Sequence, residues 1–134
     1  MKEKLYETIE YLIVYDNTDT FLFGSRSEFD DLCCKVVSML KEKYPHIKRV
    51  YIRAEYPRIS KNYEKYLLEN YEETYFPKHI VNAGKAVYIE RNYEMIDKSD
   101  ICVVYYIPTE KSGTGIAYKY AEIKKKKIIN VKNI

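Results

Sequence analysis

The sequence predicts an α/β fold in which an open, mainly parallel sheet carries helices on both faces. Two short runs, residues 20–23 and 101–106, are apolar and rich in β-branched and aromatic side chains, as strands are. The second run lacks the alternation of a half-exposed strand, which is typical of parallel strands covered on both faces. Helical patterns of about ten to fifteen residues separate the strands, and this order favours right-handed β-α-β crossovers.

The amino-terminal half is expected to run helix, strand, helix, strand. Residues 2–17 carry apolar side chains at helical spacing, and residues 20–23 form a strand that Gly24 ends. A second helix and a strand at residues 49–55 follow. The apolar stripe of that helix consists of Phe29, Leu32, Cys33, Val36, Val37 and Leu40.

Two serines are candidates for the cap of the second helix. Ser27 with Asp30, or Ser25 with Glu28, has the spacing of a capping box. Either pair would satisfy backbone N–H groups at the helix start. The turn after the first strand is therefore expected to lead directly into a helix.

The carboxyl-terminal half is expected to alternate in the same way. Residues 56–85 are interpreted as a crossover with a helix near 63–71, because Pro57 and Pro77 interrupt the chain on either side. The elements expected after it are a helix at 92–98, a strand at 101–106, a helix at 115–125 and a strand at 128–131.

Length and composition bound the class of protein. At 134 residues the chain is expected to form one domain, residues 1–134, with a single core. The sequence shows neither an apolar span for a membrane nor a signal-peptide pattern, so a cytoplasmic location without membrane contact is the default. The three cysteines and two histidines have neither a disulfide framework nor zinc-ligand spacing, and we expect no metal and no cofactor.

Nucleic acid is not an expected partner. The net charge of +3 is far from the concentrated basicity of nucleic-acid-binding domains. The lysines at 124–127 lie at the predicted end of a helix, where cations offset the helix dipole. Tyrosines occur among lysines, but no RNP-type aromatic motif accompanies them.

Three turns are expected to meet at one edge of the sheet. Ligands of open parallel sheets bind beyond the carboxyl ends of the strands, which here are followed by Gly24-Ser25-Arg26, by Glu55 and by Ser112-Gly113-Thr114-Gly115. The last turn leads into a helix, whose first backbone N–H groups attract anions. Each turn alone could serve only to start a helix, but their convergence predicts a crevice for a phosphate-bearing ligand.

Arg91 is the candidate anion-binding side chain. It lies just before the helix predicted at 92–98, within Glu90-Arg91-Asn92, and its guanidinium could pair with a phosphate or a carboxylate. A solvated surface arginine is the alternative. Glu90 is favourable at a helix start whether or not it takes part in chemistry.

These residues resemble the motifs of a known family. Glu90-Arg91-Asn92, Met95, Ser99-Asp100, the apolar strand and Ser112-Gly113-Thr114 are similar to the ERK, SD and GGxGT motifs of the LOG nucleotide phosphoribohydrolases. The wider resemblance is to the SLOG superfamily of LOG- and DprA-like proteins, which have a Rossmann-like fold. Within it, the phrases FLFGSRSEFDDLC, KRVYIRAEYP and NAGKAVYIERNYEMIDKSD are similar to short uncharacterised proteins of low-GC bacteria and their phages.

The resemblance implies a pocket for a nucleotide or a nucleotide-derived ligand. The turn from Ser112 to Gly115 would hold phosphate, and Arg91 would contact phosphate or ribose. The expected ligand-binding residues are Gly24, Ser25, Arg26, Glu55, Arg91, Asn92, Ser112, Gly113, Thr114 and Gly115.

One position argues for binding without turnover. LOG enzymes and the similarly patterned nucleoside deoxyribosyltransferases place a catalytic carboxylate three residues after the threonine of the GT motif, and here Ala117 occupies that position. Alanine can be neither a nucleophile nor a general base. We therefore expect a sensor, or a protein that sequesters a signalling nucleotide.

Two other functions remain open. The first is hydrolysis or transfer at an N-glycosidic bond, with Arg91 holding phosphate and Glu90 or Glu55 supplying the carboxylate. The second is a structural or partner-binding domain.

The start of the chain predicts self-association. Superfamily members usually open with a short strand before the first helix, and this chain opens in the helix at residues 2–17. The first strand of a doubly wound sheet is normally central, so without it two strand edges must pair directly or recruit another chain. A homo-oligomer, a dimer or larger, is expected.

Overall fold

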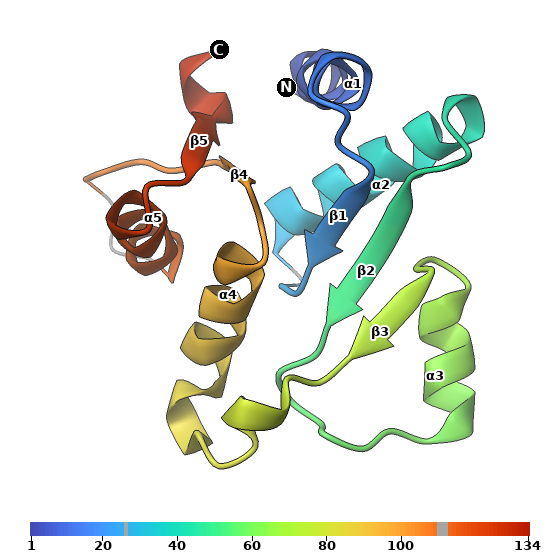
Figure 1. Cartoon of the computed structure of the whole chain (residues 1–134), viewed down its shortest axis with the longest axis vertical. Helices are drawn as coiled ribbons and strands as arrows, with labels where there is room; N and C mark the ends of the chain where they lie inside the picture. Colours follow the sequence, from blue (N-terminus) through green and yellow to red (C-terminus); the bar gives the residue numbers. More distant parts are fainter. Residues whose placement is uncertain (26, 110–112) are drawn as a thin grey trace. The chain divides into compact units, whose positions relative to one another are not determined.

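The computed structural model describes residues 1–25, 27–109 and 113–134, which form an open parallel α/β fold of the Rossmann-like class (Figure 1). The chain divides into two compact units, Met1–Phe76 and Pro77–Ile134. Both units contain parallel strands and helices. The fold class predicted from the sequence is confirmed.

The first unit is built on a three-stranded parallel sheet. Its strands are β1 (Thr20–Phe23), β2 (Lys48–Ile52) and β3 (Glu73–Tyr75), in the order β1-β2-β3. Its helices are α1 (Lys2–Tyr15), α2 (Glu28–Lys43) and α3 (Lys61–Leu68). Helix α1 packs on α2, α2 contacts β1 and β2, and α3 lies beside β3 (Figure 1).

Apolar stripes explain why α1 and α2 form and pack together. The stripes predicted from the sequence are confirmed, because both helices bury side chains at helical spacing. Burial of one such side chain contributes about 1.5–3 kcal/mol. The buried residues are Leu5, Ile9, Leu12 and Ile13 of α1, and Cys33, Val36, Val37 and Leu40 of α2.

Side chains of the β1–α2 turn satisfy its own backbone. Ser27 caps α2, since its hydroxyl accepts from the backbone N–H of Asp30 at 3.2 Å. The carboxylate of Asp30 accepts from the backbone N–H of Gly24 at 3.3 Å. The hydroxyl of Ser25 accepts from the backbone N–H of Ser27 at 2.9 Å. Of the two predicted caps, Ser27 is the one that binds the first turn of the helix.

An ion pair ties the start of β3 to β2. Nε and Nη2 of Arg49 donate to the two carboxylate oxygens of Glu72 at 3.1 and 2.6 Å, and the backbone N–H of Arg49 donates to Glu72 Oε1 at 2.8 Å. Nη1 of Arg49 reaches the hydroxyl of Ser38 on α2 at 2.9 Å. Burial opposes ionisation of Glu72, but the hydrogen bonds from Arg49 outweigh it and lower the pKa of the carboxyl.

The structure corrects two boundaries in this unit. Strand β2 ends at Ile52, three residues before the predicted end at Glu55, because the chain turns at Ala54 and Glu55. Strand β3 lies inside the segment 56–85 that was interpreted as a crossover. Its three residues are too few to show a period, and their strand conformation depends on pairing with β2.

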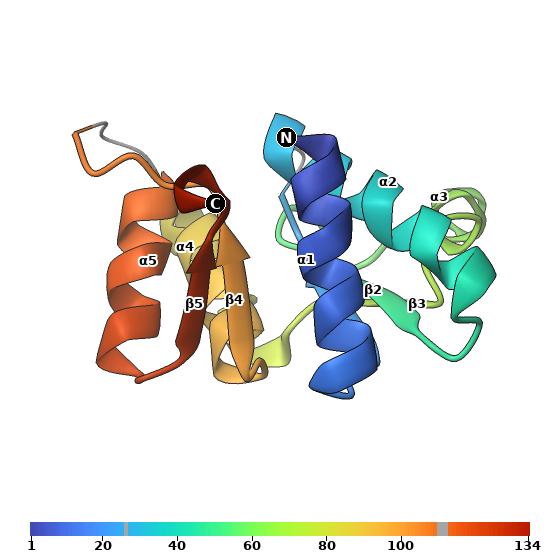
Figure 2. The ribbon, with the colours of Figure 1, turned by 90° about the horizontal axis from the view of Figure 1, so that it is seen from above.

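The second unit contains a pair of parallel strands. After two short 3₁₀ turns, Lys78–Ile80 and Gly84–Ala86, come α4 (Val87–Asp97), β4 (Ile101–Val104), α5 (Gly113–Ile123) and β5 (Lys127–Asn130), with a 3₁₀ turn at Val131–Asn133. Figure 2 shows β4 and β5 side by side with α5 along them. The carboxyl-terminal helix and strands lie within two residues of their predicted bounds.

The β4 segment departs from its predicted description in two ways. All four strand residues are half-buried, so their burial does not alternate, but neither face is fully covered. The strand ends at Val104, and Tyr106, predicted as its last residue, is held by the side chain of Asn130. The backbone N–H of Tyr106 donates to Asn130 Oδ1 at 3.1 Å, and Asn130 Nδ2 donates to the Tyr106 carbonyl at 2.9 Å.

Replacement of Glu72 by Gln is expected to lower the free energy of unfolding by about 2 kcal/mol, because it leaves the largely buried Arg49 without its charged acceptor. Urea unfolding measures the loss. The matched control is Glu73→Gln, whose carboxylate lies 3.6 Å from Lys48 in a pair with both side chains more than half exposed. This control is expected to change stability little.

The difference between wild type and Glu72→Gln also depends on pH. The folded-state pKa of Glu72 lies below the ordinary pKa of a glutamate. The stabilisation by the ion pair is therefore complete at a pH above the ordinary pKa and is lost as the pH falls through the folded-state pKa. Equal losses in the two variants, or a difference that persists in strong acid, would contradict the role given to the ion pair.

Candidate functional site

The predicted phosphate-binding turn forms the start of a helix. Gly113, Thr114 and Gly115 are the first three residues of α5, and Ser112 lies outside the described residues. Backbone N–H groups in the first turn of a helix have no acceptor within it, and the helix dipole adds a partial positive charge. An anion placed beyond this end would be stabilised by both effects.

The two glycines of this turn have different surroundings. A Cβ added at Gly113 would meet no atom of the described residues within 4 Å, whereas at Gly115 it would lie 3.3 Å from Cε1 of Tyr106. The Tyr106 ring stacks on Tyr118, with ring centroids 4.5 Å apart. Gly115 therefore makes room for an aromatic pair, while the backbone of Gly113 is exposed and open to a ligand.

The structure corrects the position of Arg91. Helix α4 begins at Val87, not at Asn92, so Glu90, Arg91 and Asn92 all lie within the helix. Gly84, which has a positive φ of 59°, is the last residue before it that favours a turn, and no Gly or Pro interrupts the following residues. The helix consequently forms five residues earlier than predicted.

Burial distinguishes Arg91 from a solvated surface arginine. Only 5% of the residue is exposed, its Nε donates to Asn92 Oδ1 at 3.0 Å, and its guanidinium carbon lies 5.9 Å from the centroid of the Tyr88 ring. A charge removed from water is costly unless it is compensated. These contacts orient the guanidinium, and the surface alternative is wrong.

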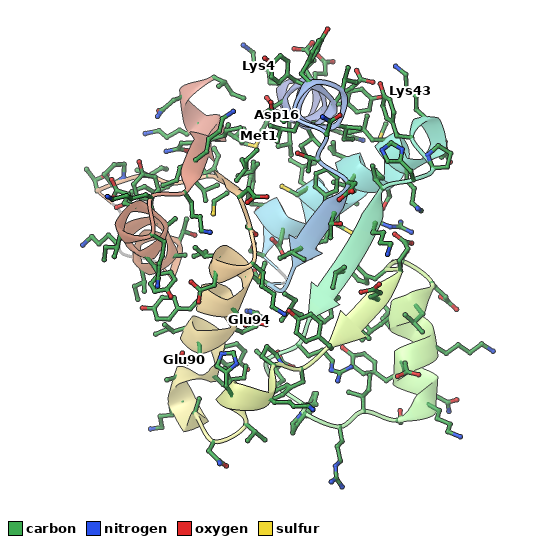
Figure 3. The ribbon with its side chains drawn as sticks, viewed as in Figure 1. Met1, Lys4, Asp16, Lys43, Glu90 and Glu94 are labelled. Atoms are coloured by element: carbon green, nitrogen blue, oxygen red, sulfur yellow. The ribbon has the colours of Figure 1, made fainter. Side chains whose placement is uncertain are left out.

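The candidate carboxylates differ in exposure. Glu90 is half-buried in the first turn of α4, with Glu94 one turn further along the helix (Figure 3). Glu55 is exposed in the loop after β2. Ala117, at the position where the family resemblance implies a catalytic carboxylate, is half-buried on α5, one turn after Thr114.

The remaining predicted residues belong to the first unit. Gly24 is buried and its N–H is already used by Asp30, Ser25 is half-buried, and Arg26 lies outside the described residues. Glu55 is in the same unit, whereas Arg91, Asn92 and the start of α5 are in the other. Convergence of the two groups in one crevice stays a prediction.

Sequence reasoning missed Arg53, which directly follows β2. Its backbone N–H donates to the carbonyl of Tyr75 at 2.8 Å, so the sheet fixes its position. Its Nε is shut off from solvent and has no hydrogen-bond partner among the described residues. The available signal was an arginine immediately after the apolar residues Val50, Tyr51 and Ile52, where parallel strands meet ligands.

The parallel strands, with a glycine-led helix after β4, define an open α/β protein of the Rossmann-like class. The chain is 32% identical over 140 residues to the uncharacterised SPbeta prophage-derived protein YoqJ of Bacillus subtilis (strain 168), a match that covers 91% of this chain and 80% of YoqJ. The chain belongs to the family of YoqJ. This agrees with the predicted resemblance to short uncharacterised proteins of low-GC bacteria and their phages.

Two searches gave no match. No protein-family model matches the chain. Within residues 1–25, 27–109 and 113–134, no helix has both the length and the apolar character needed to cross a membrane.

The two glycines of α5 are expected to respond differently to alanine. Gly113→Ala should leave stability unchanged or raise it by up to about 1 kcal/mol, because alanine is the better helix former and meets no described neighbour. Gly115→Ala should be the less stable variant by about 1 kcal/mol, because the Tyr106 ring must move and its stacking on Tyr118 weakens. Urea unfolding of both variants measures the difference.

A Tyr106→Ala background supplies the control. There the three atoms nearest to the new methyl group at residue 115 are removed, so Gly115→Ala should become neutral or stabilising. If Gly115→Ala costs the same with and without the Tyr106 ring, the ring is not the reason for the glycine.

Proposed function

We propose that this chain is a SLOG-superfamily protein that binds a nucleotide or nucleotide-derived ligand, as a sensor or as a protein that sequesters a signalling nucleotide. The observation that carries the proposal is the start of α5. There, an exposed glycine with no described neighbour within 4 Å of its missing Cβ leads the helix that is the next element after the parallel strand β4. This is the arrangement in which backbone N–H groups can approach a phosphate.

Arg91 adds a fixed positive charge in the same unit. Its guanidinium is buried, and Asn92 and Tyr88 orient it. An arginine held in this way loses less side-chain entropy when it pairs with a phosphate than a free surface arginine does. We assign it to a phosphate or to the adjacent ribose, with Gly113 and Thr114 supplying backbone donors.

Binding without turnover is the form of the proposal that the residues favour. Ala117 cannot attack a glycosidic carbon or activate water. An N-glycosidic hydrolase or transferase would have to use Glu90 or Glu55, which lie in different units of the chain. The enzyme therefore ranks second, and its product, a released base, is an outcome that the assay below can detect.

A thermal-shift panel of mononucleotides, cyclic dinucleotides and ADP-ribose derivatives tests the proposal. At 100 times Kd a ligand stabilises the folded chain by about 2.7 kcal/mol, which raises the melting temperature by several degrees. For a ligand that shifts the wild type, Gly113→Ala and Arg91→Lys should weaken binding about tenfold or more, because one blocks the backbone and the other loses the planar fork.

The matched control is Lys119→Ala, an exposed change on the same helix α5 that should bind like the wild type. The absence of a shift with every compound would contradict ligand binding and favour a structural domain. Chromatography of the same mixtures reports released base, and base release that Arg91→Lys abolishes would establish the enzyme instead.

We also propose that the chain forms a homo-oligomer. In the described sheets β1 pairs only with β2, and β4 only with β5. Neither β1 nor β4 carries a charged residue, whereas β3 begins with Glu73 and β5 with Lys127. Proteins commonly place charges on strand edges that stay exposed. The uncharged edges therefore favour pairing with further strands, and a second copy of the chain would supply them.

Light scattering after size exclusion, over a series of concentrations, should give the mass of a dimer or a larger assembly. Thr20→Lys places a charge on the exposed start of β1 and should shift the equilibrium towards the monomer. Asn62→Lys, on the exposed side of α3, is the control with the same added charge. A wild-type chain that stays monomeric at all concentrations would refute self-association.

A further inference from the structure

Arg53 occupies the place in the first unit where ligands of parallel sheets bind. It follows the last residue of β2, and β2 is the middle strand of the order β1-β2-β3. Phe23 of β1 lies opposite Tyr51, so the turn at Gly24 and Ser25 leaves the sheet at the level of Ile52 and Arg53. Arg53 therefore stands at the carboxyl edge beside one of the predicted ligand turns.

The guanidinium of Arg53 is poorly satisfied in the ligand-free chain. Nε has no hydrogen-bond partner among the described residues, and Nη2 lies 3.5 Å from the carbonyl of Pro57, at the outer limit of a hydrogen bond. No carboxylate of the described residues lies within 4.0 Å, the ion-pair distance, of the Arg53 guanidinium. Glu64 of α3 attracts the guanidinium electrostatically from further away. Removal from water lowers the pKa of Arg53.

Arg49, on the same strand, is an arginine with a structural role and allows a comparison with Arg53. Three of its side-chain nitrogens donate to Glu72 or Ser38 at 2.6 to 3.1 Å, and this pairing raises its pKa. Arg53, four residues further along, is half-buried and has no such acceptors among the described residues. A buried donor without a partner costs about 1–3 kcal/mol. The described contacts therefore give Arg53 no structural role like that of Arg49, and its Nη groups remain open to an acceptor from a ligand.

We propose that Arg53 forms an oxyanion-binding site at the carboxyl end of β2, which takes a phosphate group. A phosphate at the accessible end of the guanidinium would accept from its Nη groups, and the planar fork matches two phosphate oxygens. The site lies wholly within Met1–Phe76. It deepens the proposed function, on which it rests for the identity of a natural ligand, by assigning a phosphate site to the first unit.

Inorganic pyrophosphate is the probe, titrated into the full-length chain at constant ionic strength while the melting temperature is followed. Pyrophosphate should stabilise the wild type, Arg53→Gln should bind it about tenfold more weakly or worse, and Arg53→Lys should keep part of the affinity through its charge. Arg58→Gln, which removes an exposed arginine from the same loop, is the control and should bind like the wild type. Glu64→Gln should bind more tightly, because it removes a negative charge that acts on Arg53 and would repel pyrophosphate.

Stability without any ligand gives an independent readout. Arg53→Met removes a poorly satisfied donor and a desolvated charge, so its midpoint in urea should equal or exceed that of the wild type. A clear fall in the midpoint would assign Arg53 to the structure and overturn the proposal. Equal pyrophosphate affinities of wild type and Arg53→Gln would overturn it as well.

The site and the proposed function can fail separately. Stabilisation by pyrophosphate that depends on Arg53, with no response to any nucleotide, would keep the oxyanion site and reject nucleotide binding. Nucleotide binding that depends on Gly113 and is unchanged in Arg53→Gln would keep the proposed function and reject the site.

Discussion

The ion pair between Arg49 and Glu72 is the interaction on which the arrangement of the first unit depends. It joins residues 23 positions apart in the chain and reaches α2 through Ser38. A backbone hydrogen bond joins the same two residues, because the N–H of Glu72 donates to the carbonyl of Arg49 at 2.8 Å. Once the start of β3 is fixed, the register carries forward to Tyr75, whose carbonyl accepts from the N–H of Arg53. A structural arginine thus places a second arginine at the sheet edge.

This dependence explains which elements could be predicted. Helices α1 and α2 have long apolar stripes that local periodicity reveals, and β1 is a compact apolar run closed by Gly24, so their positions followed from the sequence. Strand β3 has no such signal. Its conformation comes from pairing with β2, and that pairing is specified by a salt bridge to a distant residue, which no local pattern contains.

The candidate site also has features that local sequence reveals and features that arise only from tertiary packing. A glycine-bearing turn between a strand and a helix is visible in the sequence, and the structure places Gly113 at a helix start. The sequence could not show that the two glycines have different surroundings, because Tyr106 approaches only Gly115. Nor could it show that Arg91 is buried and Arg53 is short of acceptors, since both properties arise from tertiary packing.

Internal contacts narrow where a phosphate can bind. The N–H of Gly24 already meets the carboxylate of Asp30, so an anion at the β1–α2 turn would compete with a charge of its own sign. At Gly113 an added Cβ would meet no described atom within 4 Å, and no described carboxylate lies within ion-pair distance of Arg53. The proposed phosphate contacts are therefore assigned to these two places, which lie in different units. Because Ala117 stands where the family resemblance implies a catalytic carboxylate, the proposal assigns to both places the holding of a ligand and not its cleavage.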